Sequence, residues 1–144
     1  MTYPRSPHER VGGIVYFGRM LDKIRLKHTE QLPSDLHQNL GGGFDKRCVD
    51  FLQVSYEDLA RKVIEGLDDR AALEWCFSAG RPPSAEQIYV WNEFMRKRGW
   101  TDDGTEMLER RKRESGLANR DDILTMFDYI DADEGRFSQK EGST

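Results

Sequence analysis

The stretch SAEQIYVWNEFMRKRG, residues 84–99, indicates most clearly how this chain folds. Ser84 and Gln87 stand at the spacing of a capping box, in which the two side chains satisfy backbone groups at the start of a helix. Gly99 is typical of a helix end. The apolar residues between them recur at helical spacing and predict a buried stripe: Ile88, Trp91, Phe94 and Met95.

Similar start and stop signals recur along the rest of the chain, and no stretch is typical of a β-strand. Helices are expected over residues 13–29, 45–52, 55–66, 68–80 and 102–115, with a short helical turn after Pro33 and a last helix capped by Asn119. The three tryptophans, Trp75, Trp91 and Trp100, are expected to anchor the core. We therefore expect an all-α fold, an irregular bundle of about six to seven short helices.

The breaks in this pattern indicate one domain over residues 1–136. A chain of 144 residues has the usual size of a single domain. Pro4 and Pro7 disfavour helix and predict an extended N-terminal arm. The expected parts are an arm, a core, a C-terminal helical pair and a flexible tail: residues 1–12, 13–98, 100–136 and 137–144.

Charge and hydropathy exclude several classes of partner. The formal net charge is -4 at pH 7, whereas proteins that bind DNA or RNA usually carry a basic excess, so no nucleic acid is expected. No apolar run approaches the ~20 residues of a membrane helix, and the polar N-terminus is not a signal peptide. Cys48 and Cys76 are isolated, as buried thiols are in a reducing compartment. These features predict a soluble, cytoplasmic protein.

Three segments carry a resemblance to a known family: PRSP (4–7), GG (12–13) and RMLDKIR (19–25). This pattern resembles small bacterial proteins catalogued as a domain of unknown function, with an R-x-x-D-K-x-R helix after a P-R-S-P arm. Asp45, DFL (50–52) and WN (91–92) fit the same pattern. The resemblance covers residues 4–98, and residues 100–136 resemble the longer form of the family. It implies a fold and no reaction.

The charged residues of the first helix allow two interpretations. Arg19, Asp22 and Lys23, with Arg25 and with Arg5 from the arm, would form a pocket for a small anion. Alternatively, their three-residue spacing would place ion pairs worth about 0.2–0.5 kcal/mol each on a solvated helix face. The sequence leaves both interpretations open.

No motif identifies a reaction. The three histidines lack the spacing of metal ligands, and the glycine run at 41–43 lacks the phosphate-binding loop pattern, so no metal or cofactor is expected and catalysis stays uncertain. One hypothesis is a non-catalytic helical module that binds a protein partner or forms a homodimer. The alternative is a small enzyme or a protein that binds an anion or metabolite between the first helix and the helix over 84–99. Its candidate ligand-binding residues are Arg5, Arg19, Asp22, Lys23, Arg25, Trp91 and Asn92.

Overall fold

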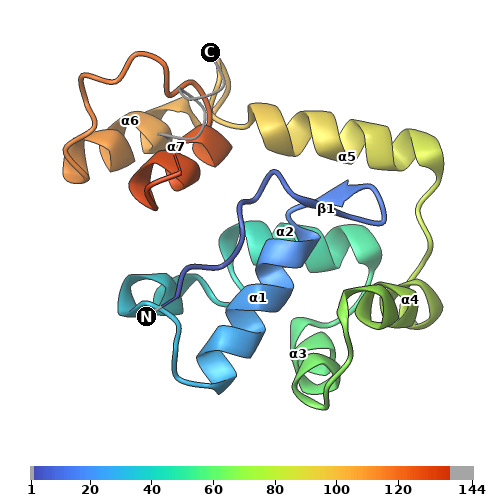
Figure 1. Cartoon of the computed structure of the whole chain (residues 1–144). Helices are drawn as coiled ribbons and strands as arrows, with labels where there is room; N and C mark the ends of the chain where they lie inside the picture. Colours follow the sequence, from blue (N-terminus) through green and yellow to red (C-terminus); the bar gives the residue numbers. More distant parts are fainter. Residues whose placement is uncertain (1, 137–144) are drawn as a thin grey trace.

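The computed structural model describes residues 2–136, and this part of the chain is mainly helical, which confirms the all-α prediction (Figure 1). The tail expected over 137–144 lies outside the described residues, and the division into an arm, a core and a C-terminal pair stays a prediction. In chain order the elements are β1 (Arg10–Val11), β2 (Ile14–Val15), α1 (Phe17–His28), the 3₁₀ helix η1 (Ser34–Asn39), α2 (Gly43–Leu52), α3 (Tyr56–Ile64), α4 (Asp69–Ala79), α5 (Ala85–Lys97), α6 (Thr105–Glu114) and α7 (Met126–Asp133).

Local capping explains where three of the helices begin. Ser84 accepts a hydrogen bond from the Gln87 backbone, and the Gln87 side chain accepts one from the Ser84 backbone, so the predicted capping box is present at α5. Ser55 caps α3 and Asp68 caps α4 in the same way, each by accepting a backbone hydrogen bond. These side chains satisfy N–H groups that a helix start leaves without an intrahelical partner.

The segment before α1 departs from the prediction. Residues 10–15 form a β-hairpin, in which Arg10 is paired with Val15 and Val11 with Ile14. The expectations that no stretch forms a strand and that the first helix begins at residue 13 are therefore wrong, because α1 begins at Phe17. Gly12 and Gly13 both have positive φ angles, 58° and 81°, as a tight two-residue hairpin turn requires.

The last helix also begins later than expected. Asn119 does not cap it; α7 begins at Met126, and the hydroxyl of Thr125 accepts a hydrogen bond from the backbone N–H of Asp128. The chain between α6 and α7 makes turns instead, and one of their hydrogen bonds joins the Ile123 N–H to the Arg120 carbonyl. The extended backbone of Thr125, with φ of -137° and ψ of 165°, explains why the helix does not extend back to residue 119.

Two apolar clusters form the interior. The larger one surrounds α1, and the smaller one contains Leu108, Ile123 and Tyr129. The short helix α7 joins them, because its Phe127 is fully buried in the larger cluster and its Tyr129 belongs to the smaller one. Figure 1 shows α6 and α7 together at the C-terminal end of α5, whereas α3 and α4 lie on the other side of α1.

None of the helices within residues 2–136 is long and apolar enough to cross a membrane. The two cysteines, Cys48 and Cys76, are free and buried as predicted. Burial raises the pKa of both thiols, that of Cys76 to about 12.

Candidate functional site

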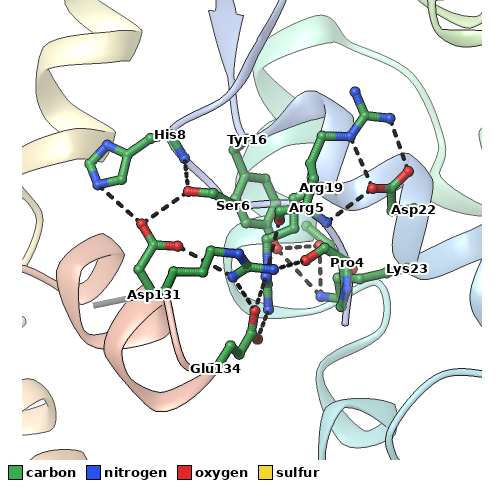
Figure 2. A network of polar contacts seen from close by, with 12 residues as sticks. Pro4, Arg5, Ser6, His8, Tyr16, Arg19, Asp22, Lys23, Asp131 and Glu134 are labelled. Atoms are coloured by element: carbon green, nitrogen blue, oxygen red, sulfur yellow. Dashed lines mark hydrogen bonds and ion pairs between the residues drawn. The ribbon is translucent and has the colours of Figure 1, made fainter. Parts of the chain in front are cut away.

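The charged face of α1 is covered by other parts of the chain. Arg19 and Lys23 are only 3% and 4% exposed, so neither lies on a solvated helix face. The N-terminal arm runs between α1 and the end of α7, and Figure 2 shows its residues Arg5 and Ser6 among the charged side chains of both. We call the polar residues that make these contacts the buried polar network: Arg5, Ser6, His8, Tyr16, Arg19, Asp22, Lys23, Arg25, Asp45, Asp69, Asp131, Glu134 and Arg136.

A bidentate ion pair joins α1 to the end of the described chain. The two terminal nitrogens of Arg19 donate to the two carboxylate oxygens of Glu134 over 2.8 and 2.6 Å, and both side chains are almost fully buried. Arg136 donates to the same carboxylate over 2.5 Å. Burial opposes the charge of the Arg19 guanidinium, but the hydrogen bonds and attraction of Glu134 raise its pKa. The two partners are 115 residues apart, so no sequence spacing indicated the pair.

A second buried group forms around Asp45, which is inaccessible to solvent. Its carboxylate accepts hydrogen bonds from the Tyr16 hydroxyl over 2.6 Å and from the Lys23 ammonium over 3.0 Å. The backbone N–H of Gly41 donates to its other oxygen. Burial lowers the pKa of Lys23 against the opposing attraction of Asp45, and burial raises the pKa of Tyr16.

The third group, around Arg5, is nearer the surface. Arg5 makes two side-chain hydrogen bonds to Asp22, both 2.9 Å long, and two to Asp69 at the start of α4. Arg25 also donates to Asp69. Burial acts against the ionised form of Asp22, but the hydrogen bonds from Arg5 hold its pKa below the ordinary value, and the same guanidinium lowers the pKa of Asp69. An added Cβ at Gly18 would lie 2.7 Å from the Arg5 guanidinium, so a larger residue at this position would displace Arg5.

Trp91 and Asn92 form hydrogen bonds to the backbone of the hairpin. The amide oxygen of Asn92 accepts from the Val15 N–H, and its nitrogen donates to the Gly13 carbonyl. The indole of Trp91 donates to the Val15 carbonyl. These bonds fix β2 against α5.

The seven predicted ligand-binding residues therefore separate into several hydrogen-bonded groups, each with partners inside the protein. The structure brings Arg5, Asp22 and Arg25 together, and it gives Arg19 and Lys23 different carboxylates. Such contacts fasten the arm, α1 and α7 to one another. A ligand-binding role for these residues stays a prediction.

A cleft lies against the outer side of this network. It encloses about 790 Å³ and is bordered by the arm, the end of α5, residues 120–125 and α7. Four residues belong both to the network and to the lining of the cleft: Ser6, His8, Asp131 and Arg136. The described residues contain no cluster of His, Cys, Asp and Glu suited to a metal ion.

Trp100 is the lining residue that the sequence interpretation misplaced. It was expected in the core, but 54% of its surface is exposed, whereas Trp91 is buried as predicted. The physical reason is that α5 ends at Lys97. Arg98 leaves the helical conformation with a ψ of 127°, and Gly99 follows with a φ of 103°, so Trp100 lies beyond the helix and outside its buried stripe. Leu124, also 54% exposed, lines the same cleft.

The arm contributes a hydroxyl and an imidazole to the cleft. The Ser6 hydroxyl donates to Asp131 over 3.0 Å, while His8 Nε2 lies 3.9 Å from the same carboxylate and 3.7 Å from that of Asp128. Both side chains therefore face carboxylates. Figure 2 shows Ser6 and His8 on the same side of Asp131.

A family model described as a domain of unknown function, DUF5069, matches residues 1–136. The chain therefore belongs to this family, which confirms the resemblance to a domain of unknown function. A comparison with curated proteins finds no match. The description of the family names no reaction.

Proposed function

We propose that this domain is a non-catalytic binding module and that it binds a small organic anion in the cleft. The observation that carries the proposal is the exposed pair Trp100 and Leu124 in a cavity of about 790 Å³ that also contains several cations. Ligand pockets commonly enclose about 300–1,000 Å³ and combine apolar walls with a few polar groups. Exposed apolar side chains that gather in a concavity are typical of a binding site.

The buried polar network supports the same function, because it makes the inner wall of the cleft rigid. Asp131 is held by Ser6 and Arg136, and Arg136 is held in turn by Glu134. A wall whose side chains are already fixed loses little conformational entropy when a ligand arrives. This arrangement favours recognition of one ligand shape.

The geometry of Ser6 favours binding over nucleophilic catalysis. An activated serine donates its hydrogen to a general base such as histidine. Here the Ser6 hydroxyl donates to Asp131, and the His8 ring faces Asp128 and Asp131.

Thermal-shift screening against a panel of metabolites tests the proposal. A compound that binds only the native state raises the melting temperature, by an amount that corresponds to RT ln(1 + [L]/Kd). We expect the hits to be anions, and we expect Trp100→Leu to abolish their shifts. Tyr89→Leu is the matched control, because Tyr89 is an equally exposed aromatic residue, 61% accessible, on α5 and outside the cleft lining.

Two outcomes would contradict the proposal. A panel in which no compound stabilises the protein would remove its basis. Hits that lose their effect in Tyr89→Leu but keep it in Trp100→Leu would place binding on another surface.

A second candidate function is self-association or binding of a protein partner through α5. Tyr89 and Val90 are 61% and 55% exposed on this helix, and Phe94, which was expected in the buried stripe, is 40% exposed. Light scattering over a range of concentrations tests the homodimer. A dimer that Val90→Glu converts to a monomer supports this candidate, and a monomer at all concentrations excludes the homodimer.

A further inference from the structure

Trp100 offers a flat apolar surface at the mouth of the cleft. Its backbone N–H donates to the Lys97 carbonyl, so the residue closes the last turn of α5 while its indole remains half exposed. Aromatic rings and nucleobases stack on such surfaces, and loss of the aromatic side chain weakens binding of a stacked base. The indole is therefore suited to a planar ring.

The same end of α5 carries two cations that share one carboxylate. Arg96 and Lys97 both line the cleft, and both pair with one carboxylate, that of Glu93, over 2.7 and 2.9 Å. Both cations are partly exposed, Arg96 to 40% and Lys97 to 57%, so a ligand in the cleft can contact them. A phosphate or carboxylate group is the natural partner of a guanidinium and an ammonium placed together.

The opposite wall offers hydrogen-bond acceptors. Asp128 and Asp131 of α7 contribute carboxylates to the lining, beside Ser6 of the arm. Ionised carboxylates accept hydrogen bonds from hydroxyl and amino groups. A ligand that spans the cleft can therefore present hydroxyl groups to α7 while its anionic group faces α5.

From these three features we infer that the ligand is a nucleoside monophosphate. The base stacks on Trp100, the phosphate pairs with Arg96 and Lys97, and the sugar hydroxyls donate to the acidic wall. This inference rests on the proposed function and narrows the class of ligand.

Isothermal titration calorimetry with three probes tests the inference: adenosine 5′-monophosphate, adenosine and ribose 5-phosphate. We expect the monophosphate to bind at least about tenfold more tightly than either fragment, because only it has both the ring and the phosphate. Trp100→Leu should weaken monophosphate binding roughly 5- to 150-fold, the range measured when stacked aromatics are removed. Tyr89→Leu should leave the affinity unchanged.

The charge is tested separately with Lys97→Gln, which leaves Arg96 alone with Glu93 and removes one of the two cations. This variant should weaken monophosphate binding, leave adenosine binding unchanged, and lose less affinity at high salt, where charges are screened. Lys62→Gln is the control, since Lys62 pairs with Glu65 on α3, away from the cleft lining.

The failures of the inference and of the proposed function are distinguishable. Equal affinity for the monophosphate and either fragment overturns the inference. The inference is also overturned if the monophosphate does not bind while another compound of the panel binds in a way that depends on Trp100. In that case the proposed function stands. If no compound of any class binds, both fail.

Discussion

The buried polar network and the cleft are neighbours that use the same kinds of side chain in opposite ways. In the network, the Arg19 guanidinium is buried and forms an ion pair with the carboxylate of Glu134, near the other end of the domain. At the cleft, Arg96 and Lys97 remain partly solvated and share a single carboxylate. Burial gives the first region a structural role, whereas exposure leaves the second able to contact a ligand. Substitutions in the two regions should therefore separate stability from binding.

The largest effect is expected for Glu134→Gln. This change removes the charge that compensates Arg19 and leaves a buried guanidinium without its ion pair, which costs about 3–5 kcal/mol of unfolding free energy. Urea denaturation measures the loss. The control is Glu74→Gln, which breaks a surface pair with Arg70 whose side chains are 78% and 64% exposed. Equal effects of the two changes would show that the network is not a special source of stability.

The hydroxyl of Tyr16 provides the next test. Tyr16→Phe removes the hydrogen bond to Asp45 while the ring stays, and a hydrogen bond to a charged group contributes about 1.5–3 kcal/mol. The loss should appear as a lower denaturation midpoint with an unchanged slope. Tyr56→Phe is the comparison, because its hydroxyl makes no hydrogen bond within the described residues. A stability of Tyr16→Phe equal to the wild type would mean that Lys23 and Gly41 alone satisfy Asp45.

A pH titration tests the more exposed part of the network. Asp22 and Asp69 have pKa values below their ordinary 3.8 in the folded protein, so both stabilise the fold above that pH. As pH falls, the unfolded chain takes up protons first, and the stabilisation is lost between about pH 5 and pH 2. Arg5→Met removes the main cause of both shifts, so the variant should lose less stability on acidification than the wild type. Thermal melts across this range measure the difference, and Arg70→Met should not change the acid profile.

The smallest effect on stability is expected at the cleft. Trp100→Leu should change the unfolding free energy by no more than about 0.5 kcal/mol, because its surface is already half exposed and surface substitutions rarely exceed that value. Chemical denaturation of this variant beside Glu134→Gln gives a direct measure of the contrast. A loss of several kcal/mol at Trp100 would assign the indole to the fold instead of to a ligand.

Features encoded within a few residues could be predicted from the sequence. Ser55, Asp68 and Ser84 each begin a helix where their spacing indicated, because a cap needs only the next three residues. The hairpin at 10–15 was missed since its strands are two residues long and do not show a period. The two consecutive glycines of its turn, Gly12 and Gly13, were the sequence feature that indicated a hairpin.

The candidate site could not be predicted in the same way. The pairing of Arg19 with Glu134 crosses nearly the whole chain, and spacing along α1 contains no information about it. The exposure of Trp100 depends on the backbone of Arg98 and Gly99, which leaves the helical conformation just before it. The charged residues of α1 that the sequence indicated therefore mostly hold the structure together. Trp100, which the sequence pattern assigned to the core, lines the cleft instead.

The position of Glu134 also has a consequence during translation. Arg19 leaves the ribosome 115 residues before its partner, a delay on the order of ten seconds at ordinary rates of synthesis. Throughout that interval the guanidinium must stay hydrated, and the place of Phe127 in the interior is vacant. The nascent polypeptide thus completes its first helix early but can close its interior only when the final helix emerges.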